Sequence, residues 1–183
     1  MVININNQQE IDNNKSDSYI IDTNILSCLF VSNQQWSSQK KSAYTNFILD
    51  LMQKNTSLYV STLSLQELFH VTERIAYEQY CRTNNKNKRQ YTLKCFRSDN
   101  AERTKLANSL KQIHSMIVNQ YQIIEEYITK GDVQDFVKTY SNHVYDPMDY
   151  LVVSHNLERC NNIITDDKDF QKDNRLNIFT YIP

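Results

Sequence analysis

Tyr19-Ile20-Ile21-Asp22-Thr23-Asn24 is the stretch that decides the fold interpretation of this chain. Three apolar or aromatic residues lead directly into a carboxylate, a hydroxyl and an amide. A short apolar run bounded by polar residues is typical of a buried strand, and the end of such a strand is where α/β proteins place their functional side chains. Taken alone, the stretch is equally typical of a strand that ends in an ordinary Asx turn.

Strands and helices alternate along the rest of the chain. Apolar residues recur at helical intervals over residues 41–54, and Leu58–Ser61 has the apolar character of a second buried strand. Further helices are predicted from near Ser64, from residues 98–99, over 133–140 and over Pro147–Arg159, and further strands over 121–125, 162–165 and 176–181. This alternation predicts an α/β fold, a three-layer α/β/α sandwich around a central parallel sheet.

Length and composition restrict the class of protein. With 183 residues, of which 40% are hydrophobic and 22% charged, the chain has the size of one globular domain. Its single glycine, Gly131, excludes the glycine-rich phosphate loops of P-loop and dinucleotide-binding enzymes. The Asn- and Gln-rich residues 1–18 are predicted to be a mobile arm, and residues 19–183 to be the domain.

Hydropathy and cysteine usage predict a cytoplasmic protein. No run approaches transmembrane length, and the N-terminus lacks the basic-then-apolar pattern of a signal peptide, so no membrane partner is expected. The four cysteines are scattered and form neither a CxxC pair nor a zinc motif. They are interpreted as free thiols in a reducing compartment.

Four acidic residues end predicted strands or begin predicted helices. Asp22 ends the first strand, Asp167 follows the strand that ends at Thr165, and Glu67 and Asp149 lie in the first turns of helices. Strand ends and the following helix starts meet at one edge of a parallel sheet, so these acids are expected to converge. Converging carboxylates repel unless cations neutralise them, and oxygen ligands without His or Cys suit Mg²⁺ or Mn²⁺. Two such ions ~4 Å apart can clamp a phosphodiester and activate water.

Each acid also has a structural explanation. Glu67 completes a capping box with Ser64, Asp149 complements the dipole of its helix, and Asp167 lies among neighbouring acids in a loop. For any single acid, this explanation is at least as good as a catalytic role. The joint occurrence of all four at one predicted edge favours a shared site.

The sequence resembles the PIN-domain family in four motifs, which occur in the family's order. They are Ile-Ile-Asp22-Thr-Asn24, Val-Ser61-Thr-Leu-Ser-Leu-Gln-Glu67-Leu, Asp149-Tyr-Leu-Val-Val-Ser-His-Asn-Leu-Glu and Ile-Ile-Thr165-Asp-Asp167-Lys-Asp169-Phe170. PIN domains are divalent-metal-dependent nucleases, mostly ribonucleases, on a parallel α/β/α sheet. Many bacterial members, of the VapC type, are toxins of toxin–antitoxin pairs.

The resemblance implies a Mg²⁺- or Mn²⁺-dependent endoribonuclease with a two-metal mechanism and an RNA substrate. It implies that the catalytic and metal-binding acids are Asp22, Glu67, Asp149 and Asp167, that Asn24 and Thr165 orient an acid or water, and that Asp169 is an auxiliary metal-binding acid. An antitoxin partner and a homodimer stay open. Asp146 is better explained as the N-cap of the helix that follows it, and His155 as a structural residue on an apolar helix face.

The chain is longer than a minimal toxin of this family, and the excess is a basic, helical insertion around residues 81–118. From Arg82 to Lys111 there are nine Lys or Arg residues and two acids, whereas the whole chain has a formal charge of −1. The residues predicted to bind substrate are Lys86, Lys88, Arg89, Lys94 and Arg97, with Tyr91 and Phe96 among them for stacking on bases. A solvated surface insertion explains this charge equally well, and a surface for an acidic partner protein is a further alternative.

Two other functions are compatible with parts of the pattern. A PIN-like module that binds nucleic acid without cleaving it would share the fold, but a degenerate copy is expected to have lost at least one acid. A phosphatase of the haloacid dehalogenase type also has an Asp at the end of its first strand. That family requires a second Asp two residues later, where this chain has Asn24.

Overall fold

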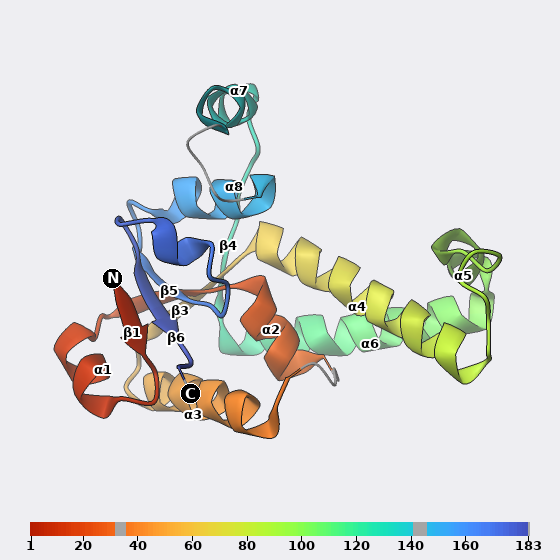
Figure 1. Ribbon diagram of the computed structural model, residues 1–183, viewed down its shortest axis with the longest axis horizontal. Helices are drawn as coiled ribbons and strands as arrows, with labels where there is room; N and C mark the ends of the chain where they lie inside the picture. The colour runs from red at the N-terminus through yellow and green to blue at the C-terminus, as the bar shows by residue number, and fades with distance from the viewer. Residues whose placement is uncertain (32–35, 141–145, 183) are drawn as a thin grey trace.

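Strand β2 (Ser18–Ile21) lies in the middle of a six-stranded sheet whose strands all run parallel. In this computed structural model, which describes residues 1–31, 36–140 and 146–182, the strand order is β1-β6-β5-β2-β3-β4 (Figure 1). The other strands are β1 (Val2–Asn4), β3 (Ser57–Ser61), β4 (Gln122–Ile124), β5 (Asn162–Ile164) and β6 (Asn177–Thr180).

Helices connect the strands and cover both faces of the sheet. They are α1 (Gln8–Asn14), α2 (Thr23–Phe30), α3 (Ser38–Gln53), α4 (Thr62–Thr83), α5 (Leu93–Ser98), α6 (Asn100–Gln120), α7 (Lys130–Thr139) and α8 (Pro147–Asn156), with a 3₁₀ helix η2 (Phe170–Lys172). The predicted α/β class, with a parallel sheet between two helical layers, is therefore confirmed. Among the described helices, none has the length and apolar character needed to cross a membrane.

Side chains of β2 point alternately to the two faces of the sheet, and each face has its own core. Tyr19 and Ile21 belong to the core formed with α1, α2, α3, α4 and α6, whereas Ile20 belongs to the core formed with α8 and η2. The Tyr19 ring makes edge contacts with Phe47 of α3 and Phe179 of β6, at centroid distances of 6.2 and 4.8 Å. Burial on both faces explains why the strand is an unbroken apolar run.

The N-terminal residues do not form the mobile arm that their polar composition predicts. β1 pairs in parallel with β6 at the edge of the sheet, and α1 begins at Asn7, whose side chain accepts two backbone N–H groups. Ile3, Ile5 and Ile11 are at most 7% exposed within the core. The prediction fails because burial of three isoleucines offsets the entropy cost of ordering an otherwise polar segment.

The insertion after β3 is a helical projection. Figure 1 shows α4 and α6 running away from the sheet to a tip that carries α5, and the three helices contact one another. At the tip, Phe96 is 1% exposed and packs edge-on against Tyr77 and Tyr80, while Tyr91 stacks on Tyr80 at 5.3 Å. Phe96 is therefore unavailable for stacking on RNA bases, contrary to the prediction, because the projecting tip needs its own apolar core.

The direction in which successive strands are added reverses at β2. The chain proceeds from β2 outward through β3 to β4, and it returns through α7 and α8 to place β5 on the other side of β2. Such a switch point leaves a crevice at the carboxyl ends of the two diverging strands, where ligands bind in open α/β sheets. Asp22 directly follows β2 and Thr165 directly follows β5, so the predicted site residues begin at this crevice.

Candidate acidic active site

A pocket of about 280 Å³ lies at this switch point. Its described lining comes from the end of β2, from α2, α4 and the start of α8, from the residue before the N-cap of α3, and from the segment after β5: Asp22, Thr23, Asn24, Ser27, Trp36, Glu67, Val71, Asp146, Asp149 and Asp167. The four acids that the resemblance implies are all members of this set. The fold thus brings together carboxylates that are up to 145 positions apart in the chain.

Asp22 is the most buried acid of the pocket, with 7% of the residue exposed. It is the N-cap of α2, since its Oδ1 accepts the backbone N–H of Thr23 at 2.6 Å. Its Oδ2 accepts the hydroxyl of Thr165 at 2.6 Å, and its own backbone N–H donates to the carbonyl of Ile164 at 3.1 Å. The carboxylate is therefore fixed between the ends of β2 and β5.

The Thr165 hydroxyl connects the residues predicted to orient the acids. Besides donating to Asp22, it accepts Nδ2 of Asn24 at 3.1 Å and the backbone N–H of Asp167 at 2.9 Å. Asn24 in turn accepts the backbone N–H of Asp166 through Oδ1 at 3.2 Å. Thr165 is fully buried, so these bonds are shielded from water and hold two of the acids in a fixed relation.

Glu67 reaches the pocket from the second turn of α4. The helix begins at Thr62, because the hydroxyl of Ser61 caps it by accepting the backbone N–H groups of Leu63 and Ser64 at 3.0 and 3.4 Å. The predicted start near Ser64 is wrong, and so is the capping box between Ser64 and Glu67. The structural explanation of Glu67 is thereby removed.

Asp149 lies in the first turn of α8, and Asp146 caps that helix as predicted. Oδ1 of Asp146 accepts the backbone N–H groups of Met148 and Asp149 at 2.8 and 3.0 Å. Asp146 also lines the pocket, which makes it a fifth acid there. The capping role explains why an Asp stands at the start of α8, and the same side chain still lies in the pocket with the other carboxylates.

Burial and mutual repulsion raise the proton affinity of two acids. Burial first, and then the charges of Glu67 and Asp167, raise the pKa of Asp22 to about 7 against the hydrogen bonds from Thr165 and Thr23. Burial followed by the charge of Asp22 raises the pKa of Asp149 to about 8. The described lining contains no Lys or Arg, so nothing basic in it offsets the five carboxyl groups. The pocket is an anionic site that a bound cation would stabilise.

The donor set suits a hard divalent cation in chemistry, since it offers carboxylate, hydroxyl and amide oxygens without sulfur or imidazole. The placement of the side chains is looser than a formed metal site. Among residues 1–31, 36–140 and 146–182, no group of three His, Cys, Asp or Glu side chains is close enough to hold an ion. The carboxylates share a pocket without converging on one point.

Trp36 and its neighbours form one wall of the pocket that the sequence reasoning did not include. The Trp36 ring lies edge-on to the ring of Tyr44 at a centroid distance of 6.1 Å, and Nζ of Lys40 lies 5.0 Å from the Trp36 centroid. Lys40 also pairs with Asp166, and the Tyr44 hydroxyl donates to the carbonyl of Thr165 at 3.2 Å. The available signal was the i, i+4 spacing of Trp36, Lys40 and Tyr44 just before and within α3.

Asp169 does not line the pocket within the described residues. Its carboxylate pairs with Lys172 at 3.3 Å, and its backbone N–H donates to Oδ1 of Asp167 at 2.9 Å. It therefore positions Asp167 through its main chain. His155 also lies outside the lining, and its Nε2 is 3.1 Å from Oδ1 of Asp132, which joins α8 to α7 in agreement with a structural role.

The predicted substrate-binding residues Lys86, Lys88, Arg89, Lys94 and Arg97 lie at the tip of the projection, and none lines the pocket. From Glu67 to Arg82 the axis of α4 rises about 22 Å at ~1.5 Å per residue, so the segment that follows Arg82 begins far from the acids. The Arg97 side chain is nearer, because it pairs with Glu73, which lies less than two turns of α4 from Glu67. Two of its cations are already paired, Arg97 with Glu73 at 2.5 Å and Lys88 with Glu78 at 3.5 Å.

No known protein family matches the chain, and no curated protein matches it. A similar solved structure is described as "Crystal structure of VapBC2 from Rickettsia felis bound to a DNA fragment from their promoter". The two chains share 16% sequence identity over 90% of this chain and 99% of that chain, with a TM-score of 0.48. Identity this low does not indicate a shared function, so function is inferred below from the residues of the pocket.

Proposed function

We propose that this protein is a PIN-like nuclease that hydrolyses phosphodiester bonds of RNA with the help of Mg²⁺ or Mn²⁺. The observation that carries the proposal is the pocket at the β2–β5 switch point, where five carboxylates from four separate segments meet without a basic residue in the described lining. Structural roles such as capping explain acids one by one. They do not explain why all of them face the same pocket, where burial first and then mutual repulsion raise the pKa values of Asp22 and Asp149.

The residues divide into ligands and supports. Asp22, Glu67, Asp149 and Asp167 would hold the cations, with Asp146 at the rim. Thr165 fixes the carboxylate of Asp22 by donating to Oδ2, and Asn24 fixes Thr165. Asp169 helps to place Asp167 through its backbone N–H, which differs from the metal-binding role of its carboxylate that the resemblance implies.

Divalent ions bound here would supply charge neutralisation at the phosphate and activation of water for attack at phosphorus. The protein's own contribution is to orient the ligands, and the bound cations would favour their deprotonated forms against the raised pKa values of Asp22 and Asp149. Because the carboxylates do not converge, we infer that Glu67 and Asp149, whose carboxylates accept no hydrogen bond from a described residue, would turn toward a bound ion. Asp22 stays in place on Thr165 and Thr23.

The test is a cleavage assay on single-stranded RNA and DNA with Mn²⁺, with Mg²⁺ and with EDTA. We expect RNA cleavage with either metal and none with EDTA. Attack by water predicts products with ordinary phosphate and hydroxyl ends, whereas a contaminating metal-independent ribonuclease leaves 2′,3′-cyclic phosphates. The Asp22→Asn variant, purified in the same way, is the matched control. Cleavage that persists in EDTA or in this variant contradicts the proposal.

A PIN-like module that binds nucleic acid without cutting it is the second candidate. One observation favours it, namely that no three potential ligands in the described residues are close enough to hold an ion. The same assay separates the two functions when RNA binding is measured in parallel. Binding without cleavage under any metal would support the second candidate and contradict the first.

A toxin role with an antitoxin partner is proposed on the sequence resemblance alone. Induced expression in bacteria should then arrest growth, and Asp22→Asn, which leaves the surface unchanged, should relieve the arrest. Growth that is unaffected by either protein at equal expression would argue for a nuclease with another cellular role.

A further inference from the structure

Trp36, the single tryptophan of the chain, belongs to the wall of the acidic pocket but has no part in the chemistry assigned above. It is half-buried, and as a lining residue it contributes surface to the pocket. The other described lining residues are acids, small polar residues and Val71. Trp36 is therefore the one aromatic surface that the described part of this pocket offers to a ligand.

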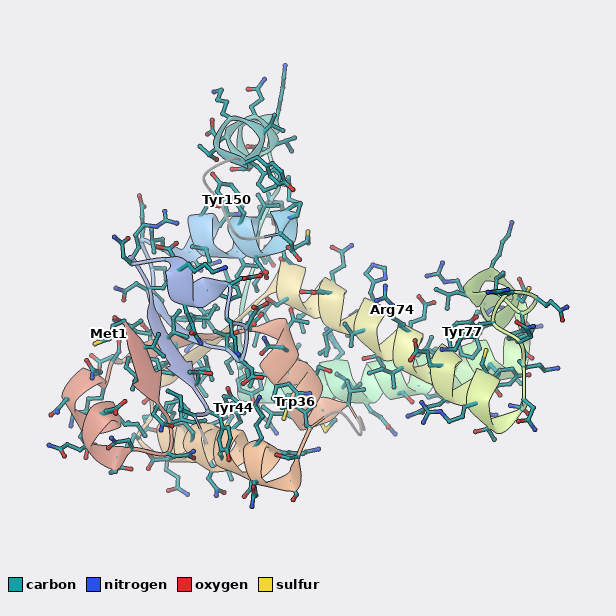
Figure 2. The ribbon with its side chains drawn as sticks, viewed as in Figure 1. Met1, Trp36, Tyr44, Arg74, Tyr77 and Tyr150 are labelled. Carbon is teal, nitrogen blue, oxygen red and sulfur yellow. The ribbon has the colours of Figure 1, made fainter. Side chains whose placement is uncertain are left out.

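The position of Trp36 is set by the same contacts that shape the catalytic edge. Its edge contact with Tyr44, at an interplanar angle of 84°, places the indole beside a fully buried ring (Figure 2). Tyr44 is anchored at its hydroxyl, which donates to the carbonyl of Thr165 and accepts the backbone N–H of Tyr181 at 3.0 Å. The indole is thus tied through one ring to the residue that holds Asp22.

The charge of the pocket leaves few attractive contacts for a nucleotide. Its carboxylates repel phosphate, and the nearest cation described beside Trp36, Lys40, is paired with Asp166. Stacking of a base on an aromatic ring does not depend on the sign of this charge and is worth ~1–3 kcal/mol per base, which is about 5- to 150-fold in affinity. An indole at the rim of an anionic pocket is suited to hold the base while bound cations hold the phosphate.

We propose that Trp36 stacks on a nucleobase adjacent to the scissile phosphodiester, and that the site therefore takes unpaired nucleotides. This inference rests on the proposed nuclease function. A base within a continuous duplex has both faces covered by its neighbours, so it has no face for the indole. The substrate class is single-stranded or loop RNA. The alternative is that Trp36 only covers the edge of the core near Tyr44, in which case its replacement changes stability and leaves RNA binding unaltered.

Because Trp36 is the only tryptophan, its fluorescence reports directly on this contact. The Asp22→Asn protein in Mg²⁺ would be titrated with three probes of equal length: a single-stranded RNA, the same strand with abasic sites, and the duplex. Stacking predicts strong quenching by the single strand alone. Equal quenching by the abasic strand would mean that the phosphates are sensed instead and would overturn the proposal.

Substitution gives the second measurement. Trp36→Leu, which keeps an apolar side chain without a ring, should weaken single-strand affinity at least about fivefold, and Trp36→Phe should restore part of it. Tyr127→Ala removes an aromatic ring that is 74% exposed and outside the pocket, and it should change nothing. Thermal unfolding of each variant shows whether the variant still folds. If the Trp36 variants do not fold, the fluorescence titration still tests the proposal, because it uses a protein that retains Trp36.

The outcomes separate this inference from the nuclease proposal. In the background that retains Asp22, Trp36→Leu should raise KM more than it lowers kcat. Metal-dependent cleavage with an unchanged KM and with no quenching on binding would remove the stacking role while the nuclease assignment stands. Absence of both cleavage and RNA binding would overturn both.

Discussion

The acidic pocket and the basic tip are opposite in charge and also in the way that the sequence encodes them. The pocket collects acids that are distant in sequence, from Asp22 to Asp167, at one switch point. The cations of the tip are close together in sequence and are spread over the end of a projection. Topology concentrates the acids, whereas local ion pairs such as Arg97 with Glu73 partly neutralise the cations.

This difference shows which pattern predicts a site. The contiguous charge run was conspicuous in the sequence, yet part of it serves the fold of the tip. Lys86, for example, lies 5.7 Å from the centroid of Tyr91. The dispersed acids were individually unremarkable, and they form the pocket with raised pKa values. Charge that remains costly in the folded state is the better sign of a ligand site.

The largest expected effect is loss of cleavage when a pocket acid is replaced by its amide. Asp22→Asn, Glu67→Gln, Asp149→Asn and Asp167→Asn should each lower kcat/KM at least about a hundredfold, because loss even of an outer partner of a metal ligand costs ~10–100-fold. Initial rates at saturating Mn²⁺ measure this effect.

Two neighbouring acids are matched controls for that series. Asp146→Asn should have little effect, since Asn caps a helix about as well as Asp. Asp169→Asn should also have little effect, because its carboxylate pairs with Lys172 and its backbone N–H is retained. A loss at Asp146 equal to that at Asp149 would show that the third acid had been assigned to the wrong residue.

The next effect concerns metal and stability. Mn²⁺ binds only the folded pocket, so it should raise the melting temperature of the wild-type protein; at a hundred times Kd the gain is ~2.7 kcal/mol. Asp22→Asn should reduce this response, whereas Lys86→Ser at the tip should leave it unchanged. Differential scanning calorimetry in Mn²⁺ and in EDTA provides the comparison. A wild-type melting temperature that does not change in millimolar Mn²⁺ would contradict the four-acid site.

The pH dependence of stability follows from the raised pKa of Asp149. A carboxyl group whose pKa rises from 3.8 to about 8 on folding contributes stability that is fully present below about pH 4 and is lost as the pH rises through about 8. In EDTA at pH 8, Asp149→Asn should therefore be more stable than wild type, by at most a few kcal/mol because the group is partly solvated.

Urea unfolding at pH 4 and pH 8 measures this difference, which should vanish at the lower pH. Asp149 is suited to the test because its carboxylate accepts no hydrogen bond from a described residue, whereas Asp22→Asn also disturbs the bonds from Thr165 and Thr23. Wild type that is more stable than Asp149→Asn at pH 8 in EDTA would show that the pocket is less repulsive than its lining indicates.

Much of the fold followed from local sequence patterns. The strand at residues 162–164 and the start of the helix that Asp146 caps lie where periodicity and capping placed them, but the helix ends at Asn156, before the predicted Arg159. The N-terminal strand was missed because the alternation of Ile3, Asn4 and Ile5 is very short and lies in a polar segment, and its burial depends on pairing with β6. Composition describes a segment alone, whereas burial depends on its partner.

The candidate site was predictable to the same extent and for the same reason. Residues at strand ends, such as Asp22 and Thr165, were found because a strand points them at a known edge. Trp36 was missed because it lies in a polar loop, outside the pattern of strand ends and helix starts that identified the acids, although its i, i+4 spacing to Lys40 and Tyr44 was a local signal. The start of α4 was misplaced because Ser61, at the end of β3, caps the helix directly. The periodicity of one helix or strand does not predict its contacts with another.

The smallest expected effect is at the tip, and it depends on substrate length. In the Asp22→Asn background, joint replacement of Lys86, Lys88 and Arg89 by Ser should lower affinity for a long single-stranded RNA and reduce its salt slope by up to about three. A trinucleotide should bind the variant and its parent equally, because it cannot span the roughly 22 Å from Glu67 to the end of α4.

Only Lys88 of the three has a described ion pair, so Lys86 and Arg89 should account for most of the change. Fluorescence anisotropy at low and moderate salt gives both slopes. If the salt dependence of affinity for the long RNA is unchanged, the tip does not bind substrate and is only a folded projection around Phe96. If the salt dependence for the trinucleotide is reduced, the tip and the pocket are closer in solution than the length of α4 allows.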